Sequence, residues 1–195
     1  MSEEPGKAQK IVQHVLTVLL LVVVGANVWW FLVRDTHQKP NHPLAEAQAP
    51  AFDLPSIDKN GAEGQALSLA SLQGKVVVLD FWATHCKPCK RQMPILDKIH
   101  RDMDKERFSV VSINIDDADS LRRHERISKW ITKGDYSFPV ILDSGTIWKD
   151  YKVKRIPTLF ILDAKGTVAD VHTGVISEKK LRQRIERVLD AQPGA

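Results

Sequence analysis

The two cysteines of this chain of 195 residues stand three positions apart, at Cys86 and Cys89. A pair with this spacing can exchange disulfides, hold part of a metal site or close a small structural loop. Cys86 lies between a predicted strand and a predicted helix, so its sulfur is expected near the unpaired N–H groups of a helix N-terminus. That position favours the thiolate, and Lys87, Lys90 and Arg91 add positive charge. We predict that Cys86 attacks, with a pKa below the free-thiol value of ~8.5, and that Cys89 resolves the mixed disulfide.

Other chemistries for the pair can be compared with the residues around it. No second pair of ligands follows at zinc spacing, and covalent haem attachment needs a histidine where Lys90 stands. His85 with both cysteines would give three ligands for copper(I), so a copper-handling or redox-sensor module is the alternative from another class. A purely structural disulfide would close a very short loop and contribute little entropy. We expect no resident metal and no cofactor, since no nucleotide-binding glycine motif is present.

The segment from Ile11 to Val33 contains no Asp, Glu, Lys or Arg. A helix of this length can cross a ~30 Å hydrocarbon core, and aromatic residues from Trp29 to Phe31 suit its headgroup region. The rival interpretation is a cleaved signal peptide, with Val15–Val24 as its apolar region and a cut after Ala26. We favour a retained anchor, because cleavage would leave a bulky apolar N-terminus exposed.

These features divide the chain into four parts: a short cytoplasmic tail (1–10), a transmembrane anchor (11–33), a proline-containing linker (34–50) and one domain (51–195). Charged residues at 27% and hydrophobic residues at 43% exclude a disordered chain and a polytopic membrane protein. A net charge of +4 without a basic stripe gives no argument for nucleic acid as a partner. Lys and Arg are nearly balanced around the anchor, so the topology has to be inferred from the chemistry.

Apolar patterns alternate between strand and helix periods along the domain. Short apolar runs predict strands over 75–82, 108–114, 139–142, 158–162 and 167–172, with a hairpin turn at 163–166. Helical periodicity predicts helices over 87–103, from a cap at Asp119 to Gly134, and after a cap at Ser177. An added hairpin is expected from Phe52–Leu54 and Ala66–Leu69. The pattern indicates an α/β fold with a mixed sheet flanked by helices.

Several spaced motifs resemble thioredoxin and, more closely, the membrane-tethered TlpA and ResA type of thioredoxin-like reductase, near the cytochrome c maturation thioredoxins. The thioredoxin motifs are Asp80-Phe81-Trp82-Ala83, Cys86-x-Pro88-Cys89-Lys90, Met93-Pro94 and Arg155-Ile156-Pro157-Thr158. The motifs of the narrower branch are Ala51-Phe52-x-Leu54-Pro55, Leu72-x-Gly74-Lys75 and Phe138-Pro139-Val140. The resemblance implies a thioredoxin-like fold with a redox-active disulfide between Cys86 and Cys89.

The resemblance also implies roles for residues outside the pair. Pro157 matches the family's cis-proline, which shapes the substrate groove, and Ile156, Trp82 and His85 are expected to bind substrate beside it. Pro94 matches the proline that kinks the active-site helix. Asp80 matches the buried aspartate beneath the cysteines, and a carboxylate in an apolar strand has a raised pKa and can exchange a proton with Cys89.

Three positions depart from the pattern. His85 stands where the family usually has tryptophan, which places a titratable ring beside Cys86. Ser112 replaces the lysine that neighbours the buried aspartate in thioredoxin. Thr158 stands where the cytochrome maturation thioredoxins carry an acidic residue, which argues against a dedicated cytochrome role.

These observations predict a membrane-tethered thiol–disulfide oxidoreductase that reduces protein disulfides outside the cytoplasm, for example in cytochrome c or copper-centre maturation. Its expected partners are protein disulfides and a membrane electron donor. The anchor would cross the cell (inner) membrane once and place the domain on the periplasmic or extracytoplasmic side. A net oxidant or isomerase is the alternative within the class, since charge that stabilises the thiolate also raises the potential. A thiol peroxidase would need only a lone reactive cysteine.

Overall fold

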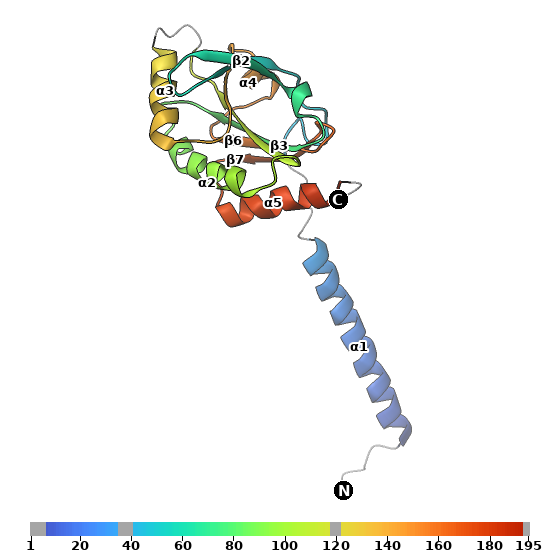
Figure 1. Cartoon of the computed structure of the whole chain (residues 1–195). Coiled ribbons are helices and arrows are strands. Elements are labelled where there is room, and N and C mark those ends of the chain that lie inside the picture. The colour runs from blue at the N-terminus through green and yellow to red at the C-terminus, as the bar shows by residue number, and fades with distance from the viewer. Residues whose placement is uncertain (1–6, 35–40, 118–121, 193–195) are drawn as a thin grey trace. The chain divides into compact units, whose positions relative to one another are not determined.

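A computed structural model describes residues 7–34, 41–117 and 122–192 (Figure 1). The chain separates into two compact units, residues 1–39 and 40–195. The second unit is built on one seven-stranded sheet with the order β2-β1-β5-β4-β3-β6-β7. The thioredoxin-like α/β arrangement expected from the sequence is therefore present.

The middle of the sheet combines parallel and antiparallel neighbours. β3 (Val76–Trp82) and β4 (Phe108–Asn114) run parallel, as do β4 and β5 (Val140–Leu142). β6 (Thr158–Leu162) is antiparallel to β3 and to β7 (Val168–Thr173). All seven residues of β3 are buried, as expected for a mainly apolar strand in a sheet that is covered on both faces, and Asp80 is its single charged residue.

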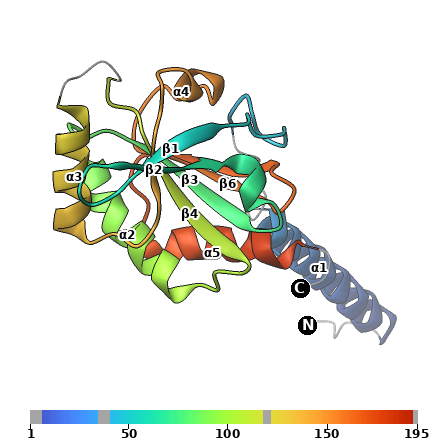
Figure 2. The same ribbon diagram turned by 45° about the horizontal axis from the view of Figure 1, so that its top comes forward.

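Helices cover both faces of the sheet (Figure 2). One face packs against α2 (Cys89–Asp102), α3 (Arg123–Gly134) and α5 (Glu178–Asp190). The opposite face packs against the short helix α4 (Ile147–Asp150), the 3-10 turn η1 (Leu69–Leu72) and residues near Phe52. Successive residues of a strand point to opposite faces, so Val78, Asp80 and Trp82 share the face that α2 covers.

Most expected elements are confirmed, with shifts at their ends. The added hairpin exists as β1 (Asp53–Ile57) and β2 (Glu63–Ser68), which join the sheet through β5. α2 begins at Cys89, two residues later than expected, and Ser177 caps α5 without a side-chain hydrogen bond. The expected cap Asp119 lies outside the described residues. The expected turn at 163–166 is present, where Gly166 has φ +80° and the Asp163 carboxylate accepts the N–H groups of Lys165 and Thr167.

The second half of the expected linker packs on the domain. Glu46 N–H donates to the Val168 carbonyl, and Val168 N–H donates to the Ala47 carbonyl, both at 2.9 Å. The His42 ring lies edge-on to Phe160 at 5.0 Å, and the Tyr151 hydroxyl donates to the Pro50 carbonyl at 2.8 Å. The folded unit thus begins about ten residues before the predicted boundary at 51. The proline-rich composition indicated an extended chain but did not indicate that β7 offers it backbone partners.

The first unit contains a single helix, α1 (Lys7–Arg34). Its stretch Lys10–Trp29, 20 residues long, satisfies the length and composition of a membrane span. Its large apolar side chains from Ile11 to Trp29 are each 50–71% exposed. Two polar side chains in the stretch donate to carbonyl groups of their own helix, Thr17 to Gln13 and Asn27 to Val23. These bonds satisfy donors that would be costly in a hydrocarbon environment.

Candidate active site

The loop that leaves β3 carries Cys86, which forms a disulfide with Cys89 at the start of α2, with a Cα–Cα distance of 5.3 Å. Cys86 is 6% exposed and Cys89 is completely buried. The Cys86 N–H donates to the Ala83 carbonyl at 3.0 Å, which closes a tight turn directly after the strand. Only Cys86 therefore offers any surface to an incoming reagent.

The N-terminus of α2 faces the Cys86 sulfur. Pro88 is the N-cap, and no side chain caps the helix. The Cys89 N–H instead donates to Cys86 Sγ at 3.1 Å. Cys89 is the first residue of α2, whereas the helix predicted over 87–103 placed it two residues inside the helix. The first free amide of the helix thus points at the sulfur that needs charge stabilisation, and Lys87, Lys90 and Arg91 lie exposed around it.

Asp80 lies completely buried in β3, on the sheet face covered by α2. The Ser112 hydroxyl donates to its Oδ2 at 3.2 Å, and its Oδ1 has no hydrogen-bond partner among the described residues. Burial raises the pKa of Asp80 to about 7, and the bond from Ser112 opposes that rise. A carboxyl group with such a pKa can both hold and release a proton near neutrality.

A second buried carboxylate, Asp116, braces the active-site loop and was not identified from the sequence. Both of its oxygens lie 3.2 Å from the Thr84 nitrogen, whose N–H they accept. Asn114 Nδ2 donates to Oδ2 at 3.2 Å, and His85 Nδ1 lies 3.4 Å from Oδ1. The parallel register pairs Trp82 with Asn114, so the loops that follow β3 and β4 lie together. A polar residue just after each of two adjacent parallel strands was the sequence signal that could have found it.

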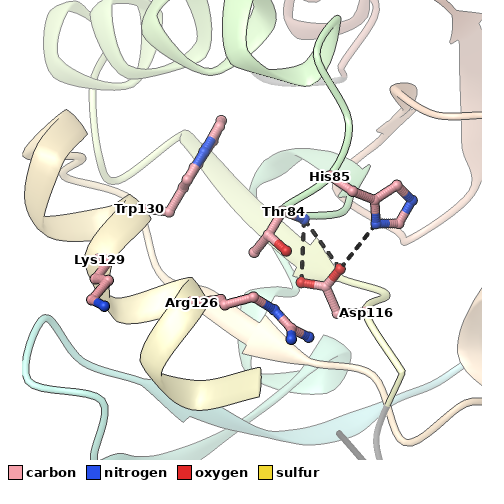
Figure 3. Close-up of a pocket in the computed structure, with 6 residues that line it drawn as sticks. All are labelled: Thr84, His85, Asp116, Arg126, Lys129 and Trp130. Carbon is pink, nitrogen blue, oxygen red and sulfur yellow. Dashed lines mark hydrogen bonds and ion pairs between the residues drawn. The ribbon is translucent and has the colours of Figure 1, made fainter. Parts of the chain in front are cut away.

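A pocket of about 480 Å³ opens beside the disulfide loop (Figure 3). Residues from three elements line it: Thr84 and His85 from the loop, Asp116 after β4, and Arg126, Lys129 and Trp130 from α3. The Trp130 ring stacks on Trp82, with centroids 5.0 Å apart and planes at 26°, and the Lys90 ammonium lies 5.3 Å from its centroid. The pocket therefore joins an aromatic wall to cationic side chains.

The residues expected to bind substrate differ in accessibility. The side chain of His85 is 78% exposed and Ile156 is half-buried. Pro157 is buried and follows a cis peptide bond, and its carbonyl accepts the Gly174 N–H at 2.8 Å. Trp82 is completely buried. Direct contact between Trp82 and a substrate is thus not possible in this form, because Trp130 covers its ring.

α2 is also tied to the segment that precedes α5. Gln92 lies one turn beyond Cys89 and is completely buried. Its Oε1 accepts the Ile176 N–H at 2.9 Å. This bond holds the first turn of the active-site helix against the chain that leaves β7, so the disulfide rests on a fixed support.

Metal-ligating side chains do not converge at the site. Within residues 7–34, 41–117 and 122–192, no three His, Cys, Asp or Glu side chains are grouped so that they could hold an ion. His85 Nδ1 faces Asp116, and the two sulfur atoms are bonded to each other. The three donors considered for copper(I) therefore do not point to a common centre in the disulfide form.

A thioredoxin-like sheet, a Cys-x-x-Cys disulfide after its central strand and a cis-proline before the antiparallel strand beside it together define a thiol–disulfide oxidoreductase. Residues 45–171 match the model of the AhpC/TSA family, and the chain belongs to this family. Thiol–disulfide oxidoreductases act on disulfides of other proteins.

Relatives and solved structures agree with this assignment. The chain is 32% identical over 170 residues to the thioredoxin-like protein YneN of Bacillus subtilis, covering 87% of this chain and 94% of the relative. It is 27% identical to the thiol-disulfide oxidoreductase ResA of Halalkalibacterium halodurans, covering 87% and 91% of the two chains. The crystal structure of StoA from Bacillus subtilis matches with a TM-score of 0.58 and 25% identity, over 70% of this chain and 96% of StoA. A thiol-disulfide isomerase from Corynebacterium glutamicum matches with a TM-score of 0.62 and 26% identity, over 74% and 98%.

The raised pKa of Asp80 predicts a pH-dependent stability of the oxidised protein. The folded protein retains the Asp80 proton up to about pH 7, whereas the unfolded chain releases it near the ordinary value of 3.8. The unfolded state therefore binds fewer protons between these pH values, and the free energy of unfolding falls as pH rises through them, by up to roughly 4 kcal/mol. Asp80→Asn is expected to remove this fall and to be the more stable protein at pH 8.

Urea unfolding at intervals from pH 4 to pH 8 measures the difference between the wild type and Asp80→Asn, which cancels the other titrating groups. Asp190→Asn, a change at an exposed carboxylate at the end of α5, is the matched control and should follow the wild type. Parallel curves for the wild type and Asp80→Asn would show that Asp80 is already ionised in the folded state at low pH.

Proposed function

We propose that this oxidoreductase is a membrane-tethered reductase of protein disulfides outside the cytoplasm, with Cys86 as the attacking and Cys89 as the resolving thiol. The observation that carries the proposal is the asymmetry of the pair. Cys86 is 6% exposed and its sulfur accepts the first amide N–H of α2, whereas Cys89 is completely buried on the side of the sheet where Asp80 lies. Two thiols with such different surroundings suit two successive steps.

In the first step the Cys86 thiolate attacks one sulfur of a partner disulfide. A bond forms between Cys86 Sγ and that sulfur, the partner's S–S bond breaks, and the second partner sulfur leaves as a thiolate that takes a proton from water. The Cys89 N–H and the exposed Lys87 stabilise the negative charge on Cys86 before the attack. His85 next to it adds to this stabilisation when its ring is protonated.

In the second step Cys89 resolves the mixed disulfide. Its thiol loses a proton to the Asp80 carboxylate, and the resulting thiolate attacks Cys86 Sγ. The partner leaves as a thiolate with two electrons gained, and the Cys86–Cys89 disulfide remains. The Asp80 pKa of about 7 suits this acceptor role, because a carboxylate with the ordinary value of 3.8 would be a much weaker base.

The partner would bind as an extended segment along the loop around Ile156. The carbonyl groups of Arg155 and Pro157 already accept bonds from Thr158 Oγ1 and the Gly174 N–H. No hydrogen bond from the described residues engages the backbone of Ile156. The Ile156 peptide group is thus the part of this loop that can pair with a partner backbone.

The net direction of electron flow follows from proton handling and from supply. A buried base beneath Cys89 speeds resolution and release, which a reductase needs at every turnover. The cations near Cys86 act in the other direction, since they stabilise the reduced form and raise the potential. Exposed charges are screened by salt and change the potential only modestly, so we assign the reductase role. An outside compartment is oxidising, and the enzyme would need a membrane electron donor.

The tether is assigned to residues 11–33 within α1. The segment is long enough to span a bilayer, and its exposed apolar side chains have no protein surface to cover them among the described residues of its unit. Of the linker, only residues around 34–41 separate the anchor from the first contacts of the domain at His42.

The asymmetry of the two thiols predicts unequal alkylation after reduction. Cys86 should react with iodoacetamide with an apparent pKa below the free-thiol value of ~8.5, and Cys89 should react far more slowly. Mass spectrometry of the labelled peptides separates the two rates. In Cys89→Ser the mixed disulfide should accumulate with the partner attached to Cys86, which also identifies the client. Equal rates at the two thiols would contradict the assignment of Cys86 as the nucleophile.

The proton-acceptor role of Asp80 predicts a selective kinetic defect. Asp80→Asn should leave formation of the mixed disulfide close to the wild-type rate and slow its resolution by about 100-fold, the lower end of the ~10²–10⁴-fold range of acid–base catalysis. Single-turnover quenching with a disulfide peptide measures both steps. Unchanged resolution between pH 6 and pH 9 would make Asp80 a purely structural residue.

The proposed location and direction predict one labelling pattern in intact cells. A membrane-impermeant maleimide should label Cys86 without added reductant, and the labelled protein should sediment with membranes and retain residues 11–33. Labelling only after lysis would place the domain in the cytoplasm. Labelling only after reduction would favour the net oxidant, and a soluble protein that begins at Asn27 would show a cleaved signal peptide.

A further inference from the structure

We propose that the pocket between the disulfide loop and α3 binds an acidic side chain of the partner polypeptide, close to the cysteine that Cys86 attacks. The inference rests on the proposed attack by Cys86 and adds the chemistry of the partner segment. The pocket holds about 480 Å³, its residues come from three separate elements, and His85, which lines it, is the direct chain neighbour of Cys86. A partner cysteine bonded to Cys86 would place its neighbouring side chains at this opening.

The wall of the pocket is preorganised. Trp130 stacks on the buried Trp82, and the Lys90 ammonium lies over the Trp130 ring at 5.3 Å. Ser128 and Thr132, on the same helix, donate to the Lys59 carbonyl at 2.6 and 2.9 Å, which fixes α3 to the β1–β2 hairpin. A wall with few remaining degrees of freedom lowers the entropy cost of binding a partner.

The Asp116 carboxylate lies at the floor of the pocket, and groups of the protein itself compensate its negative charge. Asp116 is buried, and its carboxylate accepts the Thr84 N–H and the Asn114 amide and lies against His85. The buried Arg123 guanidinium acts electrostatically on Asp116 and donates to the carbonyl groups of Asn114 and Asp143. The negative charge of Asp116 is therefore compensated from within.

The side chains at the rim are mainly cationic. Lys129, whose side chain is 73% exposed, and Arg126 belong to α3, and His85 lies on the other side of the opening with its Nδ1 toward Asp116 (Figure 3). Among the described residues, Lys129 pairs with the exposed Glu125 at 2.6 Å across one helical turn. Such an exposed pair is weak, so a carboxylate of the partner can compete for the Lys129 ammonium, which has three donors.

The sequence around the disulfide reinforces this charge. Residues 84–91 contain Lys87, Lys90 and Arg91 and no acidic residue, and Lys154 and Arg155 precede the proline loop. Rim charges of one sign select partners of the opposite sign and accelerate encounter. The cations therefore favour a partner segment with Asp or Glu beside its cysteine over one with Lys or Arg.

The test uses the reduced full chain in detergent and symmetrical disulfides of single-cysteine peptides. Each peptide series varies one of four positions, namely the two residues before and the two residues after the cysteine. Glu, Gln or Lys is placed at that position. The rate of peptide release is measured at low and high salt. At one position the Glu peptide should react about two- to fivefold faster than the Gln peptide and the Lys peptide more slowly, as expected for an exposed charge pair, and salt should reduce the difference.

Three variants assign the preference to the pocket. Lys129→Glu should abolish or invert the Glu-over-Lys ratio, whereas Glu125→Gln, which removes the competitor for Lys129, should increase it. Lys180→Glu makes the same charge change on exposed α5 and should keep the wild-type ratio. Near-ultraviolet circular dichroism checks that each variant is folded.

The outcomes separate this inference from the proposed function. If no peptide is reduced, the proposed function itself fails. Equal rates for Glu, Gln and Lys at every position, with reduction intact, would overturn only the acidic-partner assignment. A Glu preference that survives in folded Lys129→Glu would likewise overturn it, because the recognition would then lie outside the pocket.

Discussion

The burial of β3 on both faces is the constraint on which the site depends. All seven of its residues are buried, and the strand has one register with parallel β4 and one with antiparallel β6. The parallel pairing brings the loops after β3 and β4 to the same edge of the sheet. The antiparallel pairing brings the start of β6, and with it the Pro157 loop, to that same edge. The cysteine loop, Asp116 and the Pro157 loop therefore lie at one edge of the sheet because β3 pairs with both β4 and β6.

Two buried carboxylates near this edge have opposite surroundings and therefore different uses. Asp116 accepts hydrogen bonds from the loop and from Asn114, lies against His85 and has Arg123 nearby, so it holds residues 84 and 85 in place. Asp80 has a single bond from Ser112 and one oxygen without a partner among the described residues, so burial dominates and raises its pKa. A buried carboxylate whose oxygens both accept hydrogen bonds makes a site more rigid. A buried carboxylate with few hydrogen bonds has a raised pKa and can bind a proton near neutral pH. Asp116 contacts the disulfide loop, and Asp80 lies on the sheet face that α2 covers.

α3 supplies three of the residues that line the pocket beside the disulfide loop, although it is far from the cysteines in sequence. It lies in the connection between the parallel strands β4 and β5, and this crossover places it on the same sheet face as α2. Trp130 thereby covers Trp82, and the cations of α3 face His85 across the pocket. The pocket is thus built from the disulfide loop and from a helix that lies far from it in the sequence.

The sequence by itself determined the features that local patterns encode. The apolar runs identified the strands, the Cys-x-x-Cys pair with its flanking charges identified the exchange chemistry, and the uncharged run from 11 to 33 identified a helix long enough for a membrane. Only the tertiary structure decided which distant residues complete the site. Trp130 and Gln92 carry no local signature of a site, and Asp116 can be recognised only once β3 and β4 are known to be parallel neighbours. The start of α2 at Cys89 depends on its cap, and residues 42–50 pack where β7 offers backbone partners. The reason is physical: hydrophobic periodicity is a property of neighbours in the chain, whereas hydrogen bonds and stacking across the sheet depend on strand register and helix placement, which the whole core sets together.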